Sequence, residues 1–316
     1  MDRRSFLSGM AALGIGGIFS KVSAAMPLSD RLDCGKRRSH GKTGRYDEDL
    51  VVIISDLHIT PKGYQPEKFI RTRDDILKMQ PLPFNVIALG DLAYHTGRSE
   101  DYALLRELLA PLEKAGIQIT LGMGNHDRRE EFAAAFPEKA AASLLGDRYV
   151  FKVETPRADL IVLDSLQQSE DPDNWIGPGA LGDGQIQWLE RTLASYTKPV
   201  FVCAHHPLNE VGIEKMLSGS PTCSGYIYGH KHRWVTEWIK NRSHRDLVRT
   251  LCVPSTGYYG DIGHVVLRMD DKMAEASLHQ YEFFFPTPLE SGEARPALWD
   301  IIESEHKGAT CGFVYR

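Results

Sequence analysis

The segment LVVIISDLH, residues 50–58, places an apolar run directly before two side chains that can bind metal. Residues 50–54 are aliphatic and rich in β-branched side chains, which predicts a buried β-strand that ends where the polar residues begin. On a continuing strand, positions i and i+2 project to the same face, so we expect Asp56 and His58 to share one cation. The segment therefore predicts a metal site at a strand end.

The same arrangement, an apolar β-rich run followed by metal-binding side chains, recurs further along the chain. The blocks are GDLAY at 90–94, GNHD at 124–127, VCAHHP at 202–207 and GHKH at 229–232. They add Asp91, Asn125, His205, His230 and His232 to the first pair of candidate ligands. A nitrogen and oxygen donor set without thiolate suits zinc, manganese or iron. One short block alone is more often an ordinary loop, but the ordered series favours an assembled site.

This series resembles the calcineurin-like metallophosphoesterases over roughly residues 50–270, and most closely their branch of cyclic-nucleotide and glycerophosphodiester phosphodiesterases. The resemblance implies an α/β (α+β) fold, a four-layer αββα sandwich of two mixed β-sheets flanked by helices. It also implies two divalent or mixed-valence ions of manganese, iron or zinc. The first ion would be held by Asp56, His58, Asp91 and His232, and the second by Asn125, His205, His230 and a bridging Asp91.

The resemblance further implies a reaction. A hydroxide that bridges the two metals would attack phosphorus in line, and His126 would protonate the leaving alkoxide. Asp127 would orient the ring of His126. The sequence contains neither GxSxG nor GxxxxGK[ST], so no competing nucleophile or phosphate-binding motif is present. We therefore expect hydrolysis of a small phosphoester, with phosphodiesters ahead of phosphomonoesters.

Two alternatives stay open. GDLAY also fits the GDxxY form of the purple acid phosphatases, in which the tyrosine binds ferric iron. Tyr94 is therefore a candidate metal ligand, and a phosphomonoesterase is the alternative activity. The other alternative is a non-catalytic binding scaffold of the same fold. A scaffold predicts missing ligands, whereas every ligand position is filled here.

The residues expected to contact substrate lie outside the ligand positions. Arg128 and Arg129 start a predicted helix whose N-terminus would lie beside the metals and could hold an anionic group, with exposed helix-face arginines as the alternative. Tyr258 follows a late strand, where its ring could stack on a base or sugar. Loop 169–184 is rich in Gly and Pro and carries Trp175, so we expect it to line or cover the cleft.

The predicted elements place these residues in one layered domain. We expect a polar linker over 26–49, the metallophosphoesterase domain over 50–270 and an extension packing on it over 271–316. Helices are expected over 67–80, 99–116, 128–136 and 184–196, with Pro111 kinking or splitting the second. Helices and strands alternate early and strands accumulate later, which favours a mixed sheet sandwich.

The composition is that of an ordinary globular protein. The 316 residues are 42% hydrophobic and 25% charged, and the formal net charge is −5. An acidic chain lacks the electrostatic footprint of a general nucleic-acid binder. The five cysteines form no CxxC motif, and their odd number leaves at least one unpaired in a monomer. The sequence does not determine the oligomeric state.

Residues 1–25, MDRRSFLSGMAALGIGGIFSKVSAA, resemble a twin-arginine export signal. A twin arginine precedes a Gly- and Ala-rich apolar run, and small residues at 23–25 could supply a cleavage site. The apolar run is short compared with the ~20 residues of a membrane span. We therefore expect export through the twin-arginine translocase to the periplasm or medium. A plain N-terminus and an uncleaved anchor are the alternatives.

Overall fold

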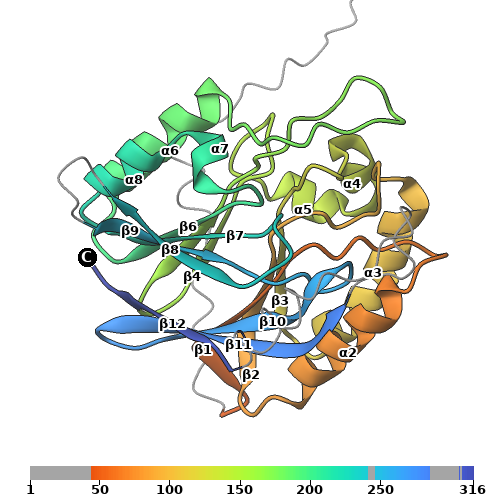
Figure 1. The fold of residues 1–316 in the computed structure, drawn as a ribbon, viewed down its shortest axis with the longest axis horizontal. Helices are drawn as coiled ribbons and strands as arrows, with labels where there is room; N and C mark the ends of the chain where they lie inside the picture. Colours follow the sequence, from red (N-terminus) through yellow and green to blue (C-terminus); the bar gives the residue numbers. More distant parts are fainter. Residues whose placement is uncertain (1–43, 241–245, 285–305, 307) are drawn as a thin grey trace, which may run out of the picture. The chain divides into compact units, whose positions relative to one another are not determined.

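The computed structural model describes residues 44–240, 246–284, 306 and 308–316 (Figure 1). The strands are β1 (Tyr46–Ile54), β2 (Leu82–Ala88), β3 (Gln118–Leu121), β4 (Phe151–Glu154), β5 (Asp159–Val162), β6 (Val200–Cys203), β7 (Cys223–Tyr228), β8 (Val235–Lys240), β9 (Asp246–Cys252), β10 (Gly260–Met269), β11 (Met273–Phe284) and β12 (Thr310–Val314). The helices are α2 (Gln65–Lys78), α3 (Ser99–Lys114), α4 (Arg129–Ala135), α5 (Pro137–Ala141), α6 (Asp183–Ser195), α7 (Leu208–Val211) and α8 (Glu214–Gly219).

The strands form two mixed sheets of six strands each. The first sheet has the order β12-β11-β10-β1-β2-β3, and the second has the order β4-β5-β6-β7-β9-β8. In the first sheet β1, β2 and β3 are parallel neighbours, and in the second β5, β6, β7 and β9 are. Parallel strands end at the same edge of a sheet, where open α/β proteins bind their ligands. Each sheet therefore gathers several of the predicted ligand blocks at one edge.

Strand β1 shows how the layers are held together, because it is buried on both faces. Val51 and Ile53 pack into the core between the two sheets, which also contains Phe201 of β6. Val52 and Ile54 pack on the opposite face, in the core shared with α2 and α3. Alternate side chains on a strand point to opposite faces, so one apolar run supplies two cores. A third core lies between the second sheet and helices α6, α7 and α8.

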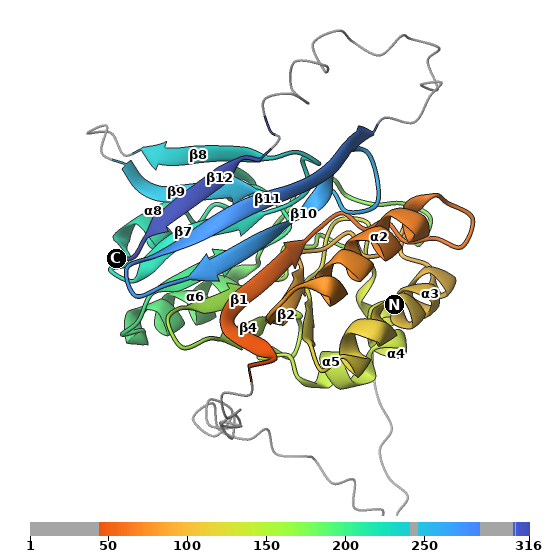
Figure 2. The same cartoon turned by 90° about the horizontal axis from the view of Figure 1, so that it is seen from below.

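The order of layers is helices, sheet, sheet, helices, which Figures 1 and 2 show from two sides. The predicted αββα sandwich is confirmed. The four predicted helices are present as α2, α3, α4 and α6. Of the kink or split expected at Pro111, the split does not occur, because helix α3 runs continuously from Ser99 to Lys114.

The first sheet includes residues from outside the predicted domain limits. Strand β1 begins at Tyr46, before the expected start at Leu50. Strands β11 and β12 belong to the predicted extension over 271–316, and they extend the sheet antiparallel to β10 and to β11. Phe313 of β12 is buried, and its ring centroid lies 5.3 Å from that of Phe201 in the second sheet. The described end of the chain therefore contributes to the core between the sheets.

The export signal over 1–25 and most of the linker lie outside the described residues. Within the described part of the chain, no helix combines the length and apolar character needed to cross a membrane. The cysteines at 203, 223, 252 and 311 are all buried free thiols.

If β12 is part of the core, then Phe313→Ala should lower the free energy of unfolding by about 3–5 kcal/mol, because it opens a cavity between the sheets. The neighbouring Val314 is 73% exposed, whereas Phe313 is 1% exposed. Val314→Ala is therefore the matched control and should change stability by less than about 0.5 kcal/mol. Urea denaturation of both variants would measure this. Equal effects of the two substitutions would show that β12 does not pack as described.

Candidate metal centre

The blocks that follow β1, β2, β3, β6 and β7 converge at one place between the two sheets. Asp56, His58 and His232 form one group of buried side chains whose potential ligand atoms lie within 4.8 Å of one another. The Nε2 atom of His232 is 3.2 Å from the Oδ1 atom of Asp56. Residues from the ends of β1 and β7, in different sheets, thus meet in one cluster.

Asp91 occupies the centre of the site. Its Oδ2 atom is 3.4 Å from the Nε2 atom of His58 and 3.2 Å from the Nε2 atom of His205. Its other oxygen accepts a hydrogen bond of 2.9 Å from the backbone N–H of His126. One carboxylate oxygen therefore lies between a histidine from the first sheet and a histidine from the second. This is the position that a bridging ligand would need.

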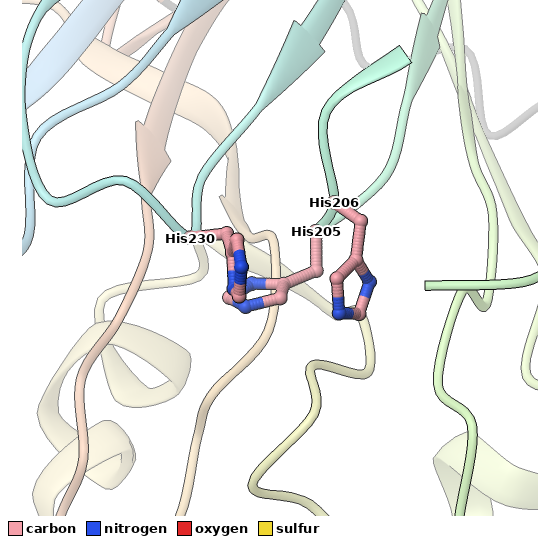
Figure 3. Close-up of side chains that lie close together, drawn as sticks. All are labelled: His205, His206 and His230. Atoms are coloured by element: carbon pink, nitrogen blue, oxygen red, sulfur yellow. The ribbon is translucent and has the colours of Figure 1, made fainter. Parts of the chain in front are cut away.

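A second group surrounds the amide of Asn125. Its Oδ1 atom is 3.2 Å from the Nε2 atom of His205 and 2.9 Å from the Nδ1 atom of His230. Figure 3 shows His205 and His206 leaving adjacent positions in different directions, with His230 beside them. His206 is also close, but both of its ring nitrogens have protein partners, the Ser165 hydroxyl at 2.8 Å and the Gly177 carbonyl at 3.1 Å. We therefore assign His206 to the support of the site and not to metal binding.

The backbone reaches this arrangement through left-handed residues. Asp56 has φ 51°, His58 φ 46°, Asp91 φ 48°, His230 φ 68° and His232 φ 54°. Strand β1 ends at Ile54, so Asp56 and His58 do not share a cation through strand alternation as we expected. Left-handed non-glycine residues cost about 1–3 kcal/mol each and cluster at functional sites. The chain turns sharply at these residues and directs successive side chains into the same space.

Two motif glycines are required by close approach. A Cβ atom on Gly124 would lie 2.2 Å from the Oδ1 atom of Asp91, and one on Gly229 would lie 1.9 Å from the Ser55 hydroxyl. Neither position can accept a side chain without displacing the loop that carries Asp56 or Asp91. Gly124 thus lets the loops after β2 and β3 of the first sheet approach each other, and Gly229 lets the loop after β7 of the second sheet approach the loop after β1.

The charges at this site call for cations. Among the described residues, Asp56 and Asp91 have only histidines as ion-pair partners, although both are fully buried. Burial alone would raise the pKa of each carboxyl, but the surrounding histidines hold both pKa values below the ordinary range. Buried carboxylates without lysine or arginine partners are expected to coordinate metal.

The ring of His58 fits the same interpretation. Burial lowers the pKa of His58 to about 3, so its ring is neutral and can donate a lone pair. Neither ring nitrogen of His58 has a hydrogen-bond partner within the described part of the chain. Neutral imidazole and carboxylate oxygen are ligands for zinc, manganese and iron. The residues present therefore fit a divalent metal site.

The family model described as calcineurin-like phosphoesterase matches residues 50–234, which is more than half of the chain. The chain belongs to the calcineurin-like phosphoesterase family. This result confirms the family resemblance that the five blocks suggested. The matched region contains every proposed metal ligand from Asp56 to His232.

Among curated proteins, the chain is 27% identical over 273 residues to a "probable cyclic nucleotide phosphodiesterase" of Rhodopseudomonas palustris, covering 75% of this chain and 94% of that protein. Among solved structures, it resembles a predicted phosphoesterase of Streptococcus pneumoniae with a TM-score of 0.38 and 12% identity, covering 84% of this chain and 97% of that one. It also resembles GAP50 of Plasmodium with a TM-score of 0.47 and 12% identity, covering 73% of this chain and 84% of that one.

His126 lies beside the ligands and is half-buried. Its ring centroid is 5.0 Å from that of His58, and its Nδ1 atom is 2.6 Å from the backbone carbonyl oxygen of His95. Because a carbonyl only accepts hydrogen bonds, Nδ1 carries a proton, and Nε2 is the nitrogen left to face a substrate. His95 was not among the predicted residues, since its contribution is a backbone atom with no sequence signal.

The expected role of Asp127 needs correction, because its carboxylate does not contact the ring of His126. It accepts hydrogen bonds from the backbone N–H groups of Leu92, Ala93 and Gly124 and from the hydroxyl of Tyr102. Asp127 therefore fastens the loop of Asp91 to the loop of Asn125. The hydroxyl of Tyr102 also accepts a hydrogen bond from the backbone N–H of Arg128. The sequence of α3 did not predict that Tyr102 supports the site, because its position fits the apolar face of the helix.

The two predicted substrate arginines have protein partners. Arg129 donates from two nitrogens to the buried carboxylate of Asp164, both at 2.8 Å, so it does not serve as a free anion-binding group. Arg128 donates to the backbone carbonyls of Ser169 and Asp171. Arg129 is thus committed to Asp164 in this structure, and its contact with substrate stays a prediction. Arg128 holds the loop that carries Trp175, and its direct contact with substrate stays a prediction.

Tyrosine side chains pack against two histidines of the site. The ring of Tyr258 lies 4.4 Å from that of His58, and the ring of Tyr259 lies 4.2 Å from that of His232. The ring centroid of Tyr94 lies 5.8 Å from that of Tyr258 and 6.4 Å from that of His58. The position of Tyr258 agrees with the predicted substrate contact, and metal binding by Tyr94 stays a prediction.

If Asp127 is an anchor, then Asp127→Ala should destabilise the metal-free protein by about 3 kcal/mol or more, because it leaves buried N–H groups without an acceptor. Urea denaturation in the presence of a chelator would separate this effect from lost metal binding. Asp173 is exposed, with 82% of its side chain accessible, and Asp173→Ala is the control with little expected change. Unchanged stability of Asp127→Ala would return Asp127 to a purely catalytic role.

Proposed function

We propose that the chain is a phosphodiester hydrolase that depends on two divalent metal ions. The observation that carries the proposal is the Oδ2 atom of Asp91, which is 3.4 Å from His58 and 3.2 Å from His205. Asp56, His58, Asp91 and His232 would hold one ion, and Asp91, Asn125, His205 and His230 would hold the other. The ions would supply positive charge at the phosphate and would lower the pKa of water to about 7.

The protein groups have distinct parts in the proposed hydrolysis. Asp91 would set the separation of the two cations, since it is shared between the two ligand groups. His126 would give a proton to the leaving oxygen from Nε2, while the carbonyl of His95 holds the proton on Nδ1. Tyr258 and Trp175 would enclose the substrate from the two sides of the centre, because each packs on a histidine of the site. Such positioned proton transfer typically contributes about 10²–10⁴-fold to the rate.

We favour a phosphodiester over a phosphomonoester as substrate. The related R. palustris protein is named as a probable cyclic nucleotide phosphodiesterase, and a cyclic nucleotide is one candidate substrate here. The acid-phosphatase alternative depends on ligation of iron by Tyr94, whose ring packs beside that of Tyr258 with the centroids 5.8 Å apart. We also propose export through the twin-arginine translocase, on the pattern of residues 1–25.

Asp91→Ala should abolish the binding of at least one metal ion and lower hydrolysis of bis(4-nitrophenyl) phosphate by about 10²-fold or more, as expected for loss of an electrostatic stabiliser. The bound metal content after reconstitution with manganese, zinc or iron and the rate of diester hydrolysis would be measured on the same samples. Wild-type protein should turn the diester over faster than 4-nitrophenyl phosphate. Normal metal content together with normal turnover in Asp91→Ala would refute the bridging role.

His126→Ala should keep its metals and lose activity in proportion to the basicity of the leaving group. The loss should approach about 10²–10⁴-fold for alkyl esters and be far smaller for 4-nitrophenyl esters, since nitrophenolate needs little protonation. A series of diesters with graded leaving groups would measure this dependence. The same loss on every member of the series would exclude His126 as the general acid.

A further inference from the structure

Trp175 is an exposed aromatic residue beside the proposed general acid. It lies between β5 and α6, and 40% of its surface is exposed. Its ring centroid is 4.5 Å from that of His126, with the ring planes at 45°. His126 contacts the indole on one side and the ring of His58 on the other. The indole thus reaches the metal centre while keeping surface available to a ligand.

The loop that carries Trp175 is tied to the segment that carries His126. Arg128 donates hydrogen bonds to the carbonyls of Ser169 and Asp171, at 3.3 and 2.5 Å. Gln168 donates to the carboxylate of Glu130 at 2.7 Å. These bonds hold the start of the loop against the beginning of α4, which directly follows the GNHD block. The contact between Trp175 and His126 is therefore supported by the surrounding structure.

A shallow surface depression lies between this loop and the metal centre, and it encloses no space large enough for a ring. One wall is the indole of Trp175, and another is His126 with Asn125. The remaining lining supplies hydroxyl and amide groups, together with one carboxylate and one guanidinium, from Thr96, Gln168, Ser169, Asn174, Asp127 and Arg128. A flat apolar wall with hydrogen-bonding groups around it is suited to a planar ring that carries polar substituents.

We propose that the exposed face of Trp175, beside this depression, is the subsite for the leaving group and that Trp175 selects planar, ring-bearing alcohols such as nucleosides or phenols. The inference rests on the proposed function, because it places the leaving oxygen at His126. In the hydrolysis, water adds to phosphorus, the P–O bond to the leaving group breaks, and His126 gives the departing oxygen its proton. The ring of the alcohol stacks on the exposed face of the indole, and Trp175 acts as a specificity residue.

The first test compares two diesters whose leaving groups have similar acidity but different shape, methyl phenyl phosphate and methyl hexafluoroisopropyl phosphate. Trp175→Ala should lower kcat/KM for the phenyl ester by about tenfold, the scale of one lost stacking contact, and change the other ester much less. Trp175→Phe should retain most of the preference. Ile176→Ala is the matched control, because Ile176 is 38% exposed in the same loop, and it should change neither substrate.

The second test does not depend on turnover. Adenosine serves as a product-like probe, added to the zinc-loaded full chain while the indole N–H signals are followed by NMR. The signal of Trp175, identified by its absence in Trp175→Phe, should shift in a saturable way, and Ile176→Ala should preserve that shift. An unmoved Trp175 signal, or equal losses on both esters, would overturn the subsite. Absence of diesterase activity in the wild type would instead overturn the proposed function, since the NMR result does not require hydrolysis.

Discussion

The constraint on which the site depends is the burial of two carboxylates that have no lysine or arginine partner among the described residues. Asp56 and Asp91 are fully buried, and histidines are their only ion-pair partners within the described residues. A buried charge is stable only when it is paired or coordinates a metal. Burial keeps the ring of His58 neutral, whereas the nearby carboxylate of Asp91 outweighs burial and raises the pKa of His205 to about 9, so a metal would have to displace the proton of His205. Cations between the two sheets would resolve this imbalance, and the ligand geometry follows from that need.

The fold stores strain in order to build this centre. Five of the proposed ligands have left-handed backbone conformations, which cost about 1–3 kcal/mol each for residues other than glycine. The surrounding structure holds them in place through the bonds that Asp127 accepts and through close contacts at Gly124 and Gly229. The two sheets bury apolar side chains between them and so provide a rigid base for both ligand groups. Rigid strands therefore position the strained loops on which the chemistry would depend.

Local patterns in the sequence predicted a mixed sheet sandwich, and the family resemblance implied its four layers. Apolar runs such as residues 50–54 predict buried strands, and the polar residues after them mark the strand ends. Roles that depend on tertiary contacts were not accessible in this way. The pairing of Arg129 with Asp164, the anchoring by Asp127 and the carbonyl of His95 all join segments far apart in the chain. Asp56 and His58 were expected to lie close together because they alternate on a strand. Strand β1 ends before them, and it is their left-handed backbone conformations that bring them together.

The most direct test of the central claim is the position of the metals themselves. We predict that anomalous diffraction from crystals grown with manganese will show two peaks about 3.5–4 Å apart, the spacing of two-metal hydrolases, on either side of the Asp91 carboxylate. One peak should contact His58 and His232, and the other Asn125, His205 and His230. A single fully occupied peak, or two peaks that do not share Asp91, would contradict a bridged pair of cations.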